Sequence, residues 1–377
     1  MRFADIIGNT DAVRALRGMA DSGRIPHAML FHENDGCGAM ALVLAFLQYL
    51  NCRDRQEGDA CGHCVSCNQV SKVIYPGIRF TFPVTSGSKV SGAVKDLTCD
   101  LFAQPWRELV LDNPFFLESE FQAAMGFEKK QGLIAVAEGK AILQKLSLAS
   151  ATEGYRAMVI YLPERMNQQT ANMLLKAIEE PADATLFLLI THAPESVLQT
   201  IASRCQPIRV LPLSREEIQE ALTRRFGKSP QEAAMAATLS GGSLGKALHL
   251  LSEQEETAAL RDLFQEMLTR LMNRDLLRAL EAGEGVAALE SRERQKAFCA
   301  YAGNALRQIF MVQQGMQAVA GIPPADEEFI VAAASRLNPV FCQKAMDALA
   351  KAAGLVDRNV LQKAIFTNLV DRLFVSI

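Results

Sequence analysis

The chain has 377 residues, 49% of them hydrophobic, and at roughly 100–200 residues per domain this length predicts two or three domains. Its 39 basic and 42 acidic side chains give a net charge of −3, which argues against a protein that grips DNA through a general basic surface. The first residues lack the basic and apolar regions of a signal peptide, and the apolar stretch 39–50 is too short to span a bilayer. We therefore expect a cytoplasmic protein.

The N-terminal part of the chain begins with the pattern of an α/β fold. The run 27–32, His-Ala-Met-Leu-Phe-His, predicts a short buried strand. Gly36 and Gly38 follow in a turn, and the apolar stretch 39–50 predicts a helix. A strand, a glycine-rich turn and a helix in this order open the α/β domains that bind nucleotides.

Four of the nine cysteines lie close together, with the spacing Cys52-x8-Cys61-x2-Cys64-x2-Cys67. In a cytosolic protein such clustering favours a metal site over disulfides. Four thiolates can bind one Zn²⁺ ion tetrahedrally, and a closed shell of four leaves no open position for water, so the predicted role is structural. Chance clustering of reduced cysteines and a redox pair are the alternatives. His63, between two ligands, is interpreted as a bystander.

Residues 78–130 have the weakest pattern in the chain. Glycine and serine in 86–92 and the aromatic run 113–116 indicate an elaborated insertion of unassigned role. We interpret its phenylalanines as a small local core in preference to a partner-binding surface; they are Phe115, Phe116, Phe121 and Phe127.

Three later apolar runs are strand candidates, at 157–162, 185–191 and 207–211. Near-continuous apolar runs suit parallel strands that are buried on both faces. Between the first two runs, a helix is predicted from Asn167 to Pro181, because it has a cap, an apolar stripe and a stop. Alternating strands and helices predict a parallel α/β sheet.

From Leu213 onward the sequence predicts helices alone. Alanine, leucine, glutamate, glutamine and arginine dominate, and no strand pattern is present. Stretches such as 276–289 carry apolar residues suited to burial between helices.

The turn after the first predicted strand has the outline of a phosphate-binding loop without its functional side chains. A working loop, G-x-x-x-x-G-K-[ST], binds phosphate through backbone amides, a lysine and a hydroxyl that holds magnesium. Here the two glycines remain, but Ala39 stands at the lysine position and Met40 at the hydroxyl position. Glu33 and Asp35 add negative charge where phosphate requires the opposite. ATP binding is therefore not expected.

Several stretches together resemble the clamp-loader subunits of bacterial DNA polymerase III. They are Gly23–Phe31, Asn172–Pro181 (similar to NALLKTLEEP), Leu198–Cys205 (similar to LPxTIxSRC) and Ser240–Leu248. The resemblance is specific over roughly residues 1–75 and 130–250. In the C-terminal part it extends only to the general structural class.

The resemblance implies a AAA+-type protein with three parts. A parallel-sheet α/β domain would occupy 1–212, with the zinc module inserted at about 52–67 and the insertion at about 78–130. A small helical lid domain would occupy 213–252, and an all-helical collar domain that mediates oligomerisation would occupy 253–377.

The positions that carry ATPase chemistry in this family are changed here. Tyr161 and Leu162 stand where the Walker B acids would hold magnesium and orient water. Gly245 stands where active subunits have a sensor arginine, while Thr191 and His192 occupy the other sensor position. With the lysine also missing, the resemblance implies a subunit that is no enzyme by itself but is part of the polymerase III holoenzyme.

The tripeptide Ser203-Arg204-Cys205 resembles the family motif whose arginine reaches across a subunit interface. An arginine supplied in trans stabilises charge on a neighbour's γ-phosphate, and is worth about 10³–10⁵ in rate in other NTPases. The resemblance implies this role for Arg204, with a plain surface arginine as the alternative. It also implies gamma/tau and delta clamp-loader subunits as partners, the sliding clamp and primed DNA as partners through the complex, and no membrane.

Two other functions are considered. An autonomous AAA+ ATPase, or an active gamma/tau-like subunit, would need a basic residue elsewhere to replace the missing lysine, and the missing acids argue against it. A nucleic-acid-binding zinc ribbon would need basic and aromatic side chains around the cysteines. The loop 53–60 is mixed in charge and 61–67 contains no lysine or arginine, so this function is disfavoured.

Overall fold

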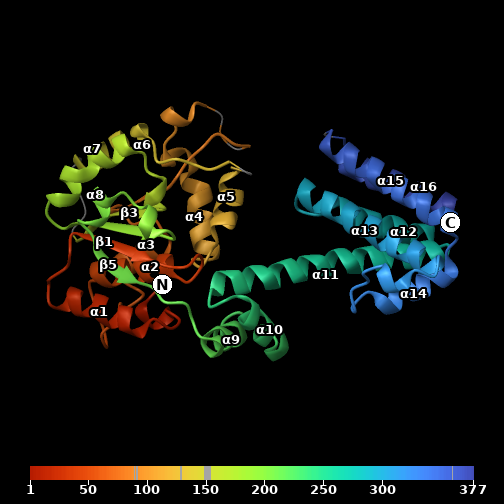
Figure 1. The fold of residues 1–377 in the computed structure, drawn as a ribbon, viewed down its shortest axis with the longest axis horizontal. Helices are drawn as coiled ribbons and strands as arrows, with labels where there is room; N and C mark the ends of the chain where they lie inside the picture. Colours follow the sequence, from red (N-terminus) through yellow and green to blue (C-terminus); the bar gives the residue numbers. More distant parts are fainter. Residues whose placement is uncertain (89, 91, 128–129, 148–153, 359) are drawn as a thin grey trace. The chain divides into compact units, whose positions relative to one another are not determined.

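The computed structural model describes residues 1–88, 90, 92–127, 130–147, 154–358 and 360–377 (Figure 1). The chain forms two compact units, Met1–Leu251 and Ser252–Ile377. In the part of the chain that is described, no helix has both the length and the apolar character that crossing a membrane requires. The further division of the chain into an α/β domain, a lid and a collar stays a prediction.

A parallel sheet in the order β2-β3-β4-β1-β5 forms the centre of the first unit. The strands are β1 (Ala28–His32), β2 (Ile78–Thr81), β3 (Arg156–Tyr161), β4 (Thr185–Thr191) and β5 (Gln206–Arg209). The predicted parallel α/β sheet is thus confirmed, and four of its strands lie close to their predicted ranges. Long apolar runs identified β3 and β4 because these strands are almost wholly buried. Strand β5 lies at the edge of the sheet and is mostly exposed.

Strand β2 was not predicted, and it lies at the start of the segment that we interpreted as an insertion. Its four residues pair in parallel with β3, with Ile78 opposite Ala157. A strand this short that contains an exposed arginine, Arg79, gives little periodic signal. Residues 89, 91, 128 and 129 of the segment 78–130 lie outside the described part of the chain.

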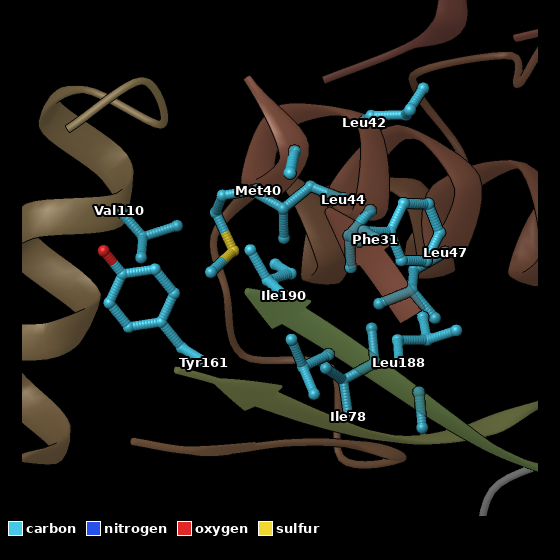
Figure 2. Packing of buried hydrophobic residues seen from close by; sticks show 14 of the residues in the cluster. Phe31, Met40, Leu42, Leu44, Leu47, Ile78, Val110, Tyr161, Leu188 and Ile190 are labelled. Atoms are coloured by element: carbon cyan, nitrogen blue, oxygen red, sulfur yellow. The ribbon is translucent and has the colours of Figure 1, made fainter. Parts of the chain in front are cut away.

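Helices of the first unit pack on both faces of the sheet. They are α1 (Thr10–Asp21), α2 (Ala39–Asn51), α3 (Val65–Ser71), α4 (Ala103–Asp112), α5 (Glu118–Met125), α6 (Val136–Ser147), α7 (Gln168–Glu179) and α8 (Gln199–Ala202). Alternate strand residues enter two different cores, as period-2 geometry requires. Phe31 and Leu188 join the core that contains α2, and Leu30 and Leu189 join the core that contains α7. Figure 2 shows the first of these cores.

Helices α9 (Arg215–Arg224), α10 (Pro230–Leu239) and the start of α11 (Leu244–Met272) complete the first unit. Ser214 and Ser229 cap α9 and α10, each in a reciprocal capping box. The helices share a small core that includes Leu213, Ile218 and Leu222.

The described residues of the second unit form helices joined by short loops and no strand. After the end of α11 it contains α12 (Leu276–Ala287), α13 (Arg292–Gln313), α14 (Glu327–Arg336), α15 (Pro339–Asp357) and α16 (Gln362–Ser376). Phe264, Phe298, Phe341 and Phe366 lie at the centre of its core. The helical character predicted from Leu213 onward is confirmed.

Candidate functional site

Four thiols meet beyond the C-terminal end of α2. The Sγ atoms of Cys52, Cys61, Cys64 and Cys67 all lie within 4.8 Å of one another. The Sγ atoms of Cys61 and Cys67 are 3.9 Å apart, and a tetrahedron with Zn–S bonds of about 2.3 Å has edges of about 3.8 Å. The donor set therefore fits a closed four-sulfur metal site, and all four predicted ligands come together.

Backbone amides support the thiolate form that a metal requires. The Cys61 N–H donates to Cys52 Sγ at 3.2 Å, and the Cys64 N–H donates to Cys61 Sγ at 3.3 Å. Burial raises the pKa of the Cys52 and Cys67 thiols. At Cys64 burial acts in the same direction, but backbone amides and the neighbouring cysteines outweigh it and lower the pKa to about 6. The exposed His63 ring contacts the Cys61 carbonyl and Asp54 instead of entering the sulfur cluster.

Residues 33–38, here named the phosphate loop, form the turn between β1 and α2. A side chain of this loop accepts a hydrogen bond from the first backbone amide of α2. Gly36 and Gly38 adopt left-handed backbone conformations, with φ of 78° and 105°. Such a loop normally leaves amides at the start of the helix free for phosphate. Here the Glu33 side chain folds back, and its Oε2 accepts a hydrogen bond from the Ala39 N–H at 2.8 Å. Glu33 is only 8% exposed, so its carboxylate occupies the amide at the predicted lysine position.

His192 lies among three carboxylates next to this loop. Its Nε2 lies 3.6 Å from Glu33 Oε1, and its Nδ1 lies 3.6 Å from Asp35 Oδ1 and 3.9 Å from Glu118 Oε2. Burial alone would lower the pKa of His192, but the three carboxylates outweigh burial and raise this pKa to about 10. His192 is therefore an imidazolium ion at neutral pH, and it compensates charge that would otherwise be buried without a partner.

A pH dependence of stability follows from this histidine. The pKa of His192 is about 10 in the folded protein and about 6.5 in the unfolded chain. The stability that protonated His192 contributes is therefore complete below pH 6.5 and is lost as the pH rises toward 10. We expect His192→Gln to lower the free energy of unfolding by about 3 kcal/mol at pH 7, and this difference to shrink toward pH 10. Urea titrations across this range measure it, with the exposed His27→Gln as control. A difference that stays constant with pH would contradict the assignment.

The predicted Walker B position is filled by an aromatic side chain. Tyr161 ends β3, is buried, and has no hydrogen-bond partner for its hydroxyl among the described residues. Its ring centroid lies 5.4 Å from that of Phe116 and 5.3 Å from that of Phe121. The neighbouring Met40 lies on the same side of the sheet (Figure 2). An apolar, aromatic environment thus replaces the acids that would hold magnesium.

The interpretation of the four phenylalanines as a separate local core needs correction. All four are buried, as expected for core residues. However, Phe116, Phe121 and Phe127 belong to the large core of the sheet domain, whereas Phe115 belongs to the core of α9 to α11. In its described residues, the segment therefore extends two existing cores and forms no separate core.

Gly245, at the predicted sensor-arginine position, touches the phosphate loop directly. Its N–H donates to the Gly36 carbonyl oxygen at 3.0 Å. A Cβ atom built on Gly245 would collide with the carbonyl oxygen of Phe115. No larger side chain fits at this position without displacing the backbone.

Arg204 lies at the other end of the sheet from the phosphate loop. It precedes β5, whose first residue, Gln206, pairs with Met29 near the start of β1, whereas the loop follows the end of β1. The Arg204 side chain is 33% exposed; its guanidinium pairs with Glu179 at the end of α7, and its Nη1 donates to the Thr200 carbonyl at 2.8 Å. The adjacent Ser203 is exposed and Cys205 is buried.

Two residues of these sites were not predicted from sequence. Glu118, at the start of α5, contacts His192 and pairs with Arg165 at 3.2 Å. Glu179 pairs with the Arg204 guanidinium, and from the sequence it was only one residue of the stretch Asn172–Pro181. Neither position has a local signal, because each partner is distant in the sequence.

Residues 8–214 match the family described as DNA polymerase III, delta subunit. The chain is 29% identical over 194 residues to DNA polymerase III subunit delta' of Yersinia pestis, covering 51% of this chain and 44% of that protein. It is 26% identical over 229 residues to subunit delta' of Escherichia coli K12, covering 61% of this chain and 55% of that protein. It is 24% identical over 256 residues to subunit tau of the same strain, covering 67% of this chain and 32% of that protein. The chain thus spans about half the length, or less, of these relatives.

Proposed function

The chain belongs to the DNA polymerase III delta-prime subunit family, and on that premise we propose that it is a clamp-loader subunit that neither binds nor hydrolyses ATP and supplies Arg204 to a neighbour's ATP site. The neighbours would be gamma/tau and delta subunits in the cytoplasm. The assembly would load the sliding clamp on primed DNA, and this chain would meet both through the complex.

The hydrogen bond from the Ala39 amide to Glu33 is the observation that carries this proposal. ATP hydrolysis requires free loop amides, a lysine on the outer phosphates and an acid that holds magnesium. Here the amide is taken by a buried carboxylate, and Ala39 and Tyr161 stand at the lysine and acid positions. A triphosphate would meet the negative charges of Glu33 and Asp35 at close range.

The position of Arg204 supports action in trans. Because it lies at the opposite end of the sheet from its own phosphate loop, it has no route to a nucleotide bound there. Its guanidinium is partly exposed and already oriented by a carboxylate, Glu179. A γ-phosphate from an adjacent subunit would offer the same planar fork a stronger anionic partner.

The four-cysteine site would hold one structural Zn²⁺ ion. Cys52, Cys61, Cys64 and Cys67 would bind it and fix the loop 52–67 against the end of α2. The module also holds the N-terminus, because the Asp59 carboxylate accepts hydrogen bonds from the Phe3 and Ala4 amides at 3.1 and 2.8 Å. Bound metal would thus stabilise the first unit and take no part in chemistry.

An active gamma/tau-like subunit is the alternative that the similarity to tau supports. Isothermal titration of the full-length chain with Mg–ATP and Mg–ADP distinguishes the two. We expect no saturable heat up to about 1 mM nucleotide, because the loop amide and charges are already compensated. A gamma/tau subunit of the same loader serves as the binding control. Tight binding with turnover by this chain alone would support the alternative and end the present proposal.

A further inference from the structure

The segment 114–118 lies against the phosphate loop. A Cβ atom on Gly38 would come within 2.8 Å of the Phe115 ring, and a Cβ atom on Gly36 within 2.7 Å of Leu117. The Glu118 N–H donates to both carboxylate oxygens of Asp35 at 3.1 Å. Both loop glycines therefore provide the space that this segment fills.

The same loop also contacts the start of α11. The Ser243 hydroxyl donates to the Asp35 carbonyl oxygen at 2.7 Å, and the Gly245 N–H donates to the Gly36 carbonyl oxygen at 3.0 Å. Phe115 completes the arrangement, because its own carbonyl oxygen fills the space beside Gly245. The backbones of the phosphate loop, the segment 114–118 and the start of α11 are thus in direct contact.

Adjacent side chains of the segment enter different cores. Phe115 packs in the core of α9 to α11 with Leu213 and Ile218, whereas Phe116 packs in the core of the sheet domain beside Tyr161. One peptide bond therefore joins two separate apolar clusters. A second tie lies nearby, where the His249 ring on α11 is 3.1 Å from the Glu120 carboxylate on α5.

We propose that residues 114–118, the clasp, act as an internal ligand that holds the helical segment 213–251 closed on the sheet domain. In enzymes whose lids close on substrate, bound ligand supplies the contacts that favour the closed state. Here the chain supplies those contacts itself: an aromatic ring over Gly38, a backbone amide on Asp35 and a carboxylate beside His192. The closed state would then be independent of nucleotide. This inference goes beyond the proposed function, because it holds whether or not Arg204 serves a neighbour.

Hydrogen exchange of the full chain, read by mass spectrometry, tests the clasp. Phe115→Ala is expected to speed exchange in 243–251 by about a hundredfold, while exchange in β3 and β4 stays close to wild type. The matched variant is Phe116→Ala, which removes an equal side chain from the other core. It is expected to raise exchange in the sheet without singling out 243–251.

A milder pair of variants guards against global unfolding. Glu118→Gln keeps the shape of the clasp but removes the charge beside His192, and is expected to raise exchange in 243–251 severalfold. Glu108→Gln, at an exposed position on α4, is expected to change nothing. If Phe115→Ala does not fold, Phe115→Leu replaces it in the comparison.

Three results would overturn the clasp. One is unchanged protection of 243–251 in both Phe115→Leu and Glu118→Gln. Another is an equal effect of the Phe115 and Phe116 variants on that segment. The third is a gain of protection in 243–251 when Mg–ATP is added to wild type, since nucleotide would then be the closing ligand. None of these results depends on the ATPase rate of the assembled loader, so the clasp and the role of Arg204 fail separately.

Discussion

Arg204→Ala is expected to lower the ATPase rate that clamp and primed DNA stimulate in the reconstituted loader, by a factor of about 10³ at the site that Arg204 serves. The reason is that the variant lacks the guanidinium that would stabilise the negative charge developing on the γ-phosphate in the transition state. A loader in which only the adjacent subunit can hydrolyse ATP gives the cleanest measurement, because the other sites then contribute no background.

Two variants separate catalysis from assembly in this experiment. Arg209→Ala removes an exposed arginine on the neighbouring strand β5 and is expected to leave the rate unchanged. Arg204→Lys keeps the charge but loses the planar fork, and is expected to recover only a small part of the rate. All variants are compared after size-exclusion chromatography has shown an intact complex. An undiminished rate in an intact Arg204→Ala complex would leave this chain a scaffold at most.

Disrupting the four-cysteine site is expected to have the second large effect, a loss of bound zinc and of stability. The wild-type chain should carry one zinc ion, and Cys64→Ser should bind zinc much more weakly and lose it to a chelator, since three thiolates leave the fourth coordination position open. The free energy of unfolding should fall by several kcal/mol, because metal binding contributes to folding and the module also anchors the N-terminus. Metal analysis and thermal unfolding with and without a strong chelator measure both quantities.

Cys299→Ala is the matched control for this prediction. Cys299 is a buried cysteine of the second unit, outside the sulfur cluster, so its replacement should leave the metal content at one ion per chain. The hypothesis of a structural zinc site would fail if wild type purified with full stability and no metal, or if Cys64→Ser kept its zinc as firmly as wild type in the presence of the chelator.

Features encoded locally could be predicted from the sequence. The four clustered cysteines lie between residues 52 and 67, so their spacing alone indicated the cluster. Strands β3 and β4 were identified because each is a continuous apolar run. Strand β2 was missed because four residues with an exposed arginine give no clear period, and only pairing with β3 defines it.

The interior of the phosphate loop could be predicted only in part. The sequence places Ala39 at the expected lysine position and negative charge at Glu33 and Asp35. It does not indicate which residues pack against the loop, because Glu118 and Gly245 reach the loop from positions far along the chain. Long-range contacts of this kind arise from packing and leave no periodic signal in the sequence.

The direct contact between Gly36 and Gly245 also limits which substitutions the protein can accept. An arginine at position 245 would collide with the Phe115 carbonyl oxygen, so the backbone of residues 114–118 would have to move. A carboxylate at position 161 would lie near the rings of Phe116, Phe121 and His192. Positions 161 and 245 are therefore coupled through the segment 114–118, and a substitution at either position has to be matched by a change in that segment.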